Sequence, residues 1–390
     1  MKERDLKVIY LSSFPPRECG IATFTQSYID HIHEINSFID QKVIAVDEIR
    51  AEKRDYPAIV KYHLEAEELE SYEKVARYIN ESGADVFCLQ HEYGLFGGFD
   101  GIFILKLLEK INVPTVTFFH SVPVVKEAKK REFRLKILKK ITNHSKFVIV
   151  TANLARNFLI KKGFPRKKII TIHHGGVEIP FPKREEKEKL KKKKGMEKRF
   201  VILTYGLIVK NKGIDYAIEA IKNLKEKYPQ ILYLVLGEAH PIHIRAMEKD
   251  YYSSLQEKVK KWKLEKHVKF IPKFLEEKEI IEYLKLCDIY LLPYLTKEQI
   301  SSGTLANAMT TGCCVVSTPF PYAREMLDEK RGFFINFKDS KSIEETLKNL
   351  IENQTLLDKT RKKAYLFSKK FTWPNVARQV IKIFQQARKL

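Results

Sequence analysis

Three loops rich in small residues in the second half of the chain could together bind a phosphate group. They occupy residues 206–213, 237–241 and 299–304, and each follows an apolar segment of strand length. Glycine lets backbone N–H groups approach a ligand closely, a helix N-terminus carries partial positive charge, and Lys212 adds a full charge beside it. One such loop alone is more often a simple turn. Three in this order predict one pocket for a diphosphate.

Titratable side chains also follow apolar segments in the first half of the chain. A loop after the first segment ends at Gly20, His91 and Glu92 precede a run of glycines, and His120 ends a further segment. A histidine at a strand end can simply cap a neighbouring helix, and His91 and Glu92 can simply shape their loop. Because ligands of parallel sheets bind beyond the carboxyl ends of the strands, we predict that these residues face a ligand.

Apolar segments of strand length alternate with segments of helical periodicity along the chain. Expected strands cover residues 7–12, 41–46, 86–90, 115–120, 147–151, 168–172, 200–205, 231–236, 268–270, 289–293 and 314–317. Expected helices begin at residue 21 and cover 67–82, 101–110, 125–142, 153–162, 214–227, 243–262, 276–286, 302–311 and 342–353, with an amphipathic helix after Pro374. This alternation predicts an α/β fold whose parallel sheets are covered by helices on both faces.

Residues 183–199 interrupt the alternation. They are almost all lysine and glutamate, and residues 191–194 are four consecutive lysines. Such a charge run is typical of a solvated connector. We therefore expect two domains, residues 1–182 and 183–371, because a chain of 390 residues suits two α/β domains of about 150–200 residues.

The chain is strongly basic, with a formal net charge of +22. One interpretation is a lysine-rich surface with the ion-pair networks of a thermophile protein. Another is attraction to an anionic substrate or to an anionic membrane surface. Nucleic acid is disfavoured as a partner, because the sequence has no RNP aromatic motif, zinc-ligand spacing or helix-turn-helix pattern.

A basic helix is expected within residues 125–142. Residues 126–140 carry eight lysines and arginines, while Phe133, Ile137 and Ile141 share one face. Packing of this face on a sheet, with solvated charges, is the first interpretation. Contact with anionic lipid, which suits a lipid-linked acceptor, is the alternative.

The compartment follows from what the sequence lacks. It has no apolar run of about 18 residues, no signal-peptide pattern, and no metal-ligand or disulfide spacing among its five cysteines. We expect a cytoplasmic protein with reduced thiols, and peripheral contact with the inner membrane face stays open.

The motifs of the second half resemble those of the retaining GT-B glycosyltransferases of family 4, also called glycosyltransferase group 1. In that family a strand leads into Gly-Arg-Leu-x-x-x-Lys-Gly, and residues 206–213 are similar, with Leu207 in the arginine position and Lys212 in the lysine position. The family motif Glu-Gly-Phe-Gly-x-x-x-x-Glu-Ala-Met, followed by glycine, a strand and Pro-Glu, resembles residues 299–309 and 312–325.

The resemblance covers residues 200–335, and the first half is similar more loosely, through the Gly20 loop and His120. It implies a GT-B fold, with two Rossmann-like, doubly wound parallel-sheet domains facing a central cleft. The closing helix, residues 372–390, resembles the one that crosses back onto the N-terminal domain. The first domain would then bind the acceptor and the second a nucleotide-sugar.

Individual roles follow from the resemblance. Lys212 and the backbone of residues 301–304 would hold the donor diphosphate, and His120 would touch the donor sugar. The predicted donor-binding residues are Gly20, Gly206, Lys210, Lys212, Gly237, Gln299, Ser301, Ser302, Gly303, Thr304 and Asn307. No metal or other cofactor is expected, because lysine and helix dipoles supply the charge that Mg²⁺ supplies elsewhere.

The sequence departs from the family at three positions. The paired glutamates of the motif are Gln299 and Asn307, and Leu207 stands for the arginine. Asn307 can still bind ribose hydroxyls, but Gln299 cannot stabilise a cationic centre as a carboxylate would. Lys210 and Arg245 are candidates for the missing positive charge.

These departures leave the retaining outcome open. An inverting enzyme needs a general base beside the acceptor hydroxyl, and Glu92 and His91 are the candidates. Residues 299–304 and 91–94 are typical of a mannosyltransferase-like subgroup, which favours GDP-mannose as the donor.

The first prediction is therefore a metal-independent hexosyltransferase whose acceptor is a glycan, an anionic polyol or a lipid-linked sugar. A UDP-sugar-dependent transferase is one alternative. A nucleotide-sugar-binding protein that has lost catalysis, and a glycan phosphorylase or epimerase of the same fold, are the others.

Overall fold

The computed structural model describes residues 5–47, 54–126, 130–238 and 248–389. The chain divides into two compact units, Met1–Gly175 with Trp373–Leu390, and Gly176–Thr372.

Residues 176–182, which the sequence patterns placed at the end of the first half, belong to the second unit. Gly176 forms a parallel bridge with Thr372, and the Val177 N–H donates to Asn307 Oδ1 (3.2 Å). The Tyr365 hydroxyl donates to the Ile179 carbonyl (2.8 Å). These bonds attach the segment to the second unit.

The first unit is built on a parallel sheet of seven strands in the order β3-β2-β1-β4-β5-β6-β7. The strands are β1 (Lys7–Ser12), β2 (Asp40–Asp47), β3 (Val60–Glu65), β4 (Val86–His91), β5 (Thr115–Phe119), β6 (Phe147–Val150) and β7 (Ile169–Thr171). All neighbours pair in parallel, so their carboxyl ends share one edge. The direction in which strands are added reverses beside β1, and ligands of such sheets bind at this reversal, between β1 and β4.

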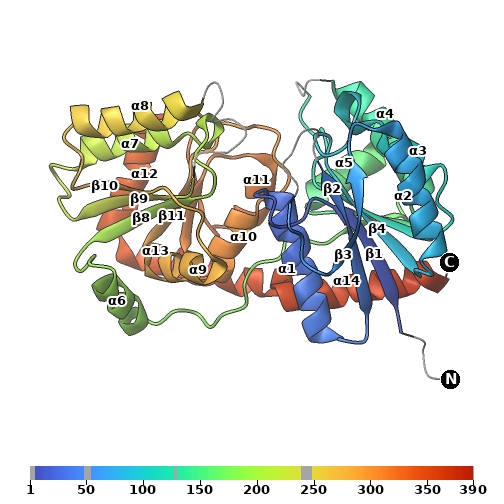
Figure 1. The fold of residues 1–390 in the computed structure, drawn as a ribbon. Coiled ribbons are helices and arrows are strands. Elements are labelled where there is room, and N and C mark those ends of the chain that lie inside the picture. Colours follow the sequence, from blue (N-terminus) through green and yellow to red (C-terminus); the bar gives the residue numbers. More distant parts are fainter. Residues whose placement is uncertain (1–4, 48–53, 127–129, 239–247, 390) are drawn as a thin grey trace. The chain divides into compact units, whose positions relative to one another are not determined.

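Helices cover both faces of this sheet (Figure 1). On one face α1 (Gly20–Ile35) packs against the C-terminal α14 (Trp373–Lys389). Right-handed crossovers place α2 (Leu69–Glu81), α3 (Ile104–Leu108) and α4 (Arg131–His144) on the other face. A short helix, α5 (Asn153–Lys161), packs against β6 and β7, and a 3₁₀ turn, η1 (Phe99–Gly101), precedes α3.

The second unit repeats this architecture with six parallel strands in the order β10-β9-β8-β11-β12-β13. The strands are β8 (Phe200–Tyr205), β9 (Ile231–Leu236), β10 (Val268–Ile271), β11 (Ile289–Leu292), β12 (Cys314–Ser317) and β13 (Phe333–Phe334). The helices are α6 (Arg184–Lys193), α7 (Ile214–Leu224), α8 (Glu248–Lys261), α9 (Glu277–Leu286), α10 (Gly303–Thr310), α11 (Pro321–Leu327), α12 (Ser340–Glu352) and α13 (Gln354–Ser368). The reversal here lies between β8 and β11.

The central strands explain why this sequence forms parallel sheets. Every residue of β4, β8 and β9 is buried. Strands covered on both faces read as continuous apolar runs, and this is the pattern that predicted them. The helix α7 presents Ile214, Ile218 and Ile221 to the core at helical spacing. The two Rossmann-like sheets confirm the expected fold class.

Besides α6, which replaces the expected connector, the elements β3, α11, β13 and α13 were not predicted. The edge strand β3 alternates half-buried and exposed residues, and it contains Lys61 and His63, so it lacks an apolar run. The strand β13 has only two residues, and α11 begins directly at Pro321. Short or polar elements of this kind are specified by their neighbours and not by their own composition.

The expectation of a solvated connector at residues 183–199 is wrong. Residues Arg184–Lys193 form α6, and its lysines Lys187 and Lys191 are buried. Their ammonium groups bind the buried carboxylate of Asp288 at 2.6 and 2.9 Å. Asp288 Oδ2 also accepts the Val201 N–H (2.7 Å) at the start of β8. The charge run therefore anchors a helix to the second sheet.

The basic helix begins later than predicted, at Arg131 and not at residue 125, after Lys130 in a left-handed conformation (φ 57°). Ile137 and Ile141 are buried, as expected for a face packed on the unit, whereas Phe133 of the predicted face is half-buried. Arg134 binds Asp100 (3.2 Å), and Lys136, Lys139 and Lys140 are exposed. Residues 127–129 of the predicted helix lie outside the described residues.

None of the helices in the described ranges combines the length and apolar character needed to cross a bilayer. The five cysteines are free thiols, as the sequence predicted.

Asp288→Ala should lower the free energy of unfolding by about 3–5 kcal/mol, because it leaves two buried ammonium groups without a counter-charge. Denaturant unfolding near neutral pH measures this. The matched control is Asp358→Ala, which removes the exposed partner of Arg361 (3.4 Å) and should cost at most about 1 kcal/mol. Equal losses in the two variants would contradict a role for the buried pair.

The effect of Asp288→Ala should also depend on pH. Burial by itself would raise the pKa of Asp288, but Lys187 and Lys191 outweigh burial and hold this pKa below its usual value. The ion pairs therefore stabilise the fold fully above the unfolded pKa of about 3.9, and this contribution is lost as pH falls through the folded pKa. The difference in the free energy of unfolding between the Asp288→Ala variant and the unsubstituted protein should therefore shrink only in acid.

Candidate functional site

The loops that follow β8, β9 and β11 are neighbours, because these three strands are adjacent in the second sheet. They are the three small-residue loops that the sequence singled out, and residues 239–241 of the second loop lie outside the described residues. Two glycines bring the first two loops together. A Cβ atom on Gly237 would lie 2.1 Å from the Gly206 carbonyl oxygen, and both residues have positive φ (128° and 122°). The Ile208 N–H then donates to the Glu238 carbonyl (2.8 Å).

A third glycine fixes the β8 loop against the end of β11. A Cβ on Gly213 would lie 2.0 Å from the Pro293 carbonyl oxygen, and the Leu295 N–H donates to the Asn211 carbonyl (2.7 Å). The loops on both sides of the reversal are therefore held backbone to backbone. Only glycine fits where the chains approach this closely.

Lys212 is the cation of this site. A Cβ placed on Gly206 would lie 3.8 Å from Lys212 Nζ and 3.9 Å from Thr304 Cγ2, so the three residues converge. Lys212 Nζ lies 3.9 Å from the centre of the Tyr294 ring. Among the described residues Lys212 has no carboxylate partner, whereas Lys210 is exposed on the short turn η2 (Lys210–Lys212). Lys212 Nζ therefore lies beside the glycine loop, and Lys210 stays a prediction.

Hydroxyl groups surround the start of α10. Ser302 is its N-cap and accepts the Leu305 N–H (3.2 Å). The Thr304 hydroxyl lies 3.2 Å from Ser302 Oγ and 3.0 Å from the Tyr294 hydroxyl. Uncapped N–H groups and the helix dipole favour an anion at this end. Gly206, Lys212 and Thr304 therefore frame a place for a diphosphate.

The two amides that replace the family glutamates are both engaged within the unit. Gln299 Nε2 donates to the Ser301 carbonyl (2.8 Å). Asn307 Nδ2 donates to the Tyr205 hydroxyl (3.1 Å), while Asn307 Oδ1 accepts the Val177 N–H. These bonds use the Asn307 oxygen and one of its N–H groups. Arg245, the other candidate cation, lies outside the described residues.

In the first unit, His120 follows β5 at the carboxyl edge. Its Nε2 lies 2.8 Å from Gln90 Oε1, at the end of β4. Since the amide oxygen can only accept, Nε2 carries the proton and Nδ1 remains an acceptor. The ring stands 4.9 Å from that of Phe24, edge to face. Burial, with His174 and His91 nearby, lowers the pKa of His120 to about 3, so the imidazole is neutral at physiological pH.

Glu92 lies at the same edge, half-buried. Its Oε2 accepts the Ser121 hydroxyl (2.6 Å) and its Oε1 accepts the Tyr93 N–H (2.9 Å). Burial raises the pKa of Glu92, although these hydrogen bonds and Arg134 oppose the shift. A carboxylate with a raised pKa is a stronger base than an exposed one, which suits proton abstraction near neutral pH.

His91 differs from these two residues because its ring is fully buried. It packs among Tyr93, Phe96 and Phe119, and both ring nitrogens lack a hydrogen-bond partner. Burial lowers the pKa of His91 to about 3. The ring therefore faces the core and not the edge, which favours Glu92 over His91 as the base.

Gly20 begins α1 beside the reversal of the first sheet. It is exposed, and a Cβ there would meet no described atom within 4 Å. The preceding Cys19 caps the helix, accepting the Ala22 N–H through its sulfur (3.3 Å). An open glycine at a helix start leaves room for a ligand at this position.

Sequence reasoning missed the residues that hold the candidate groups in place. Gln90 positions His120, Ser121 positions Glu92, and Tyr294 lies beneath Lys212. Gln90 and Ser121 directly adjoin predicted residues, so their proximity was a usable signal. Tyr294 could have been suspected as the residue that follows the predicted strand end at Pro293.

Comparison with known proteins agrees with this geometry. Residues 186–367 match the family described as glycosyl transferases group 1, and residues 40–175 match the one described as glycosyltransferase family 4. Between them, these two matches span most of the chain. The second half of the chain is thus similar to the group 1 glycosyltransferases, and the first half to those of family 4.

Individual relatives are more distant. The chain is 26% identical over 251 residues to the amylovoran biosynthesis glycosyltransferase AmsK of Erwinia amylovora, which covers 63% of this chain. It spans little more than half the length of that protein, 56%.

Two solved structures share the fold over nearly the whole chain. Anabaena HepE in complex with UDP aligns with a TM-score of 0.75 at 15% identity, covering 98% of this chain and 100% of HepE. Sucrose-phosphate synthase from Thermosynechococcus elongatus aligns with a TM-score of 0.75 at 16% identity, covering 98% of each chain. The chain has the GT-B fold.

Gly237→Ala should destabilise the second unit, because positive φ alone costs a non-glycine residue about 1–3 kcal/mol and the new Cβ meets the Gly206 carbonyl. Gly20→Ala, where no described atom lies nearby, is the matched control and should change stability little. Unfolding midpoints in denaturant compare them. Equal midpoints would show that the two loops do not approach as described.

Proposed function

We propose that the protein transfers a hexosyl group from a nucleotide-sugar to an acceptor hydroxyl, with donor binding in the second unit. The observation that carries this proposal is the convergence of Gly206, Lys212 and Thr304 beyond the ends of β8 and β11. A diphosphate bound there meets a lysine without a described counter-ion, backbone N–H groups and a helix N-terminus. These groups stabilise the charge that develops on the leaving nucleoside diphosphate without a metal ion.

The first unit supplies the groups proposed to act on the sugars. His120, neutral and fixed by Gln90, offers Nδ1 as an acceptor to a hydroxyl of the donor sugar. Glu92 accepts the proton of the acceptor hydroxyl, whose oxygen forms the new bond to the anomeric carbon as the bond to the diphosphate breaks. The absence of a carboxylate at Gln299 favours this direct displacement, which inverts the anomeric configuration.

The sequence motifs favour GDP-mannose as the donor, while HepE, a protein of this fold, has been solved with UDP-glucose. The resemblance in residues 299–304 and 91–94 supports the mannosyl donor. The fold of HepE supports the uridine donor. The two proposed donors differ in the nucleobase and in the sugar, and they share the diphosphate.

A nucleotide-sugar-binding protein without transfer activity is the second candidate. The engagement of Gln299 and Asn307 within the unit supports it, because neither amide replaces the charge of the family glutamates. Donor binding without transfer to any of a broad set of glycan, polyol and lipid-linked acceptors would establish this candidate.

Calorimetric titration with GDP-mannose, GDP, UDP-glucose and UDP tests the donor. We expect one nucleotide pair to bind, because the convergence of Gly206, Lys212 and Thr304 suits the diphosphate of either pair and the nucleobase distinguishes the pairs. Tighter binding of the GDP pair supports the mannosyl proposal, and tighter binding of the UDP pair replaces it. If no nucleotide binds, the proposed function is wrong.

Lys212→Ala should weaken binding of the preferred nucleoside diphosphate by about 1–3 kcal/mol, the range for losing one charge-assisted partner. Lys260→Ala, which removes an exposed charge from α8, is the matched control and should leave the affinity unchanged. Unchanged affinity in the Lys212 variant would remove this residue from the donor site.

A further inference from the structure

The first sheet ends in an open edge at β7. This strand pairs with β6 alone, and the Val148 and Ile172 N–H groups donate across that pair to Lys168 and Val150 (2.8 and 3.0 Å). The backbone N–H and C=O groups of successive residues point to opposite sides of a strand. Those of Ile169 and Thr171 therefore point away from β6. An edge strand leaves such groups available to another molecule, although here the Ile169 carbonyl already accepts from Arg156.

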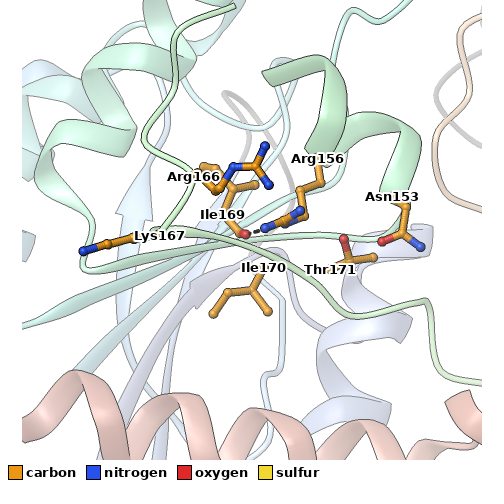
Figure 2. A pocket seen from close by; sticks show the side chains of 7 residues that line it. All are labelled: Asn153, Arg156, Arg166, Lys167, Ile169, Ile170 and Thr171. Atoms are coloured by element: carbon orange, nitrogen blue, oxygen red, sulfur yellow. Dashed lines mark hydrogen bonds between the residues drawn. The ribbon is translucent and has the colours of Figure 1, made fainter. Parts of the chain in front are cut away.

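A hollow of about 440 Å³ lies along this edge (Figure 2). Its lining comes from the start of α5, the turn before β7 and β7 itself. The lining residues are Asn153, Arg156, Arg166, Lys167, Ile169, Ile170 and Thr171. Three of these seven side chains are cationic and none is acidic.

The three cations have no acidic partner in the described part of the unit. Among the described residues no carboxylate lies within ion-pair distance of Arg156, Arg166 or Lys167. Arg156 is held by its Nε, which donates to the Ile169 carbonyl (2.9 Å) and leaves its other N–H groups for a ligand.

A second, independent feature is the hydroxyl of Thr171. Its oxygen is buried and has no hydrogen-bond partner. Buried hydroxyl groups almost always have a partner, and this one belongs to a residue that lines the hollow. A bound oxyanion would accept its proton.

Positive charge on an edge strand also discourages pairing with another strand. That explanation accounts for Arg166 and Lys167, which are exposed, but it does not require Arg156 to be fixed by the strand or Thr171 to lack a partner. A bound phosphate accounts for all four of these residues, because guanidinium groups bind phosphate through paired N–H groups and hydroxyl groups donate to it.

We propose that this edge groove, defined by the seven lining residues, binds a phosphate group carried by the acceptor. The assignment of this phosphate to the acceptor substrate rests on the proposed function. The groove runs from Arg166 and Lys167, which precede β7, to Thr171 at its carboxyl end. That end lies two strands from β5, which His120 follows, and two strand spacings are about 10 Å. A sugar linked to phosphate can span from the groove toward that histidine.

Binding of inorganic pyrophosphate to the full chain tests the groove, in a Lys212→Ala background that weakens the donor site. Arg166→Ala with Lys167→Ala should weaken this binding at least about tenfold, because two charge-assisted contacts are lost. Both residues are exposed, so the fold should be retained. Thr171→Val, which removes the hydroxyl at constant charge, should weaken binding severalfold.

The matched control is Lys139→Ala with Lys140→Ala, which removes the same charge from exposed positions of α4. Vesicles of phosphatidylglycerol and phosphatidylcholine in equal parts separate the sources of phosphate. Pyrophosphate binding that is lost in the groove variants supports a soluble acceptor, and vesicle binding lost in the same variants supports a lipid-linked one. Equal effects of groove and control variants, or no binding of either probe, would overturn the proposal.

The same titrations with UDP and GDP keep the two proposals apart. Nucleotide binding should be unaffected by the groove variants when Lys212 is present. If neither nucleotide binds the unsubstituted chain, the proposed function fails, while the pyrophosphate result still decides whether the groove is a phosphate site.

Discussion

Parallel pairing with a reversal of strand order is the constraint on which the rest of this protein depends. In each sheet the first strand of the unit, β1 or β8, lies in the interior, and later strands are added first on one side and then on the other. Parallel strands place all carboxyl ends at one edge, and the reversal separates the two adjacent loops so that a ligand can enter between them. Residues as distant in sequence as Gly206 and Thr304 therefore converge in the second unit, and Gln90 and His120 do so in the first.

Close backbone packing then sets the positions of the side chains. Because Gly237 touches the Gly206 carbonyl and Gly213 touches that of Pro293, the β8 loop has little freedom. Lys212 precedes Gly213 directly, so the fixed glycine also fixes the base of the lysine chain, and the Tyr294 ring supports its ammonium group. A lysine held in this way loses less entropy on binding a phosphate than a lysine on a free loop would.

The protein treats its buried charges in two different ways. Asp288 is ionised and shared by two ammonium groups, so its cost of desolvation is offset by pairing and by a backbone hydrogen bond. The imidazoles of His91, His120 and His174 are instead kept neutral, and burial lowers the pKa of His174 to about 4. The cations at Lys212 and beside β7, which have no carboxylate partner among the described residues, are available to a ligand. This contrast separates groups that hold the fold from groups that are available for chemistry.

How far the sequence predicts this arrangement depends on how local each signal is. Buried strands such as β8 and β9 were predicted at their observed bounds, because continuous apolar runs report burial on both faces. The role of α6 could not be predicted, since Lys191 finds Asp288 97 residues later and a lysine run by itself indicates solvent. The candidate site divides in the same way: glycine loops and strand-end residues were visible, whereas the support of Lys212 by Tyr294 and of Glu92 by Ser121 depends on strand neighbours that only the sheet order defines. Local sequence patterns thus identify the candidate functional residues, and the order of the strands determines which other residues position them.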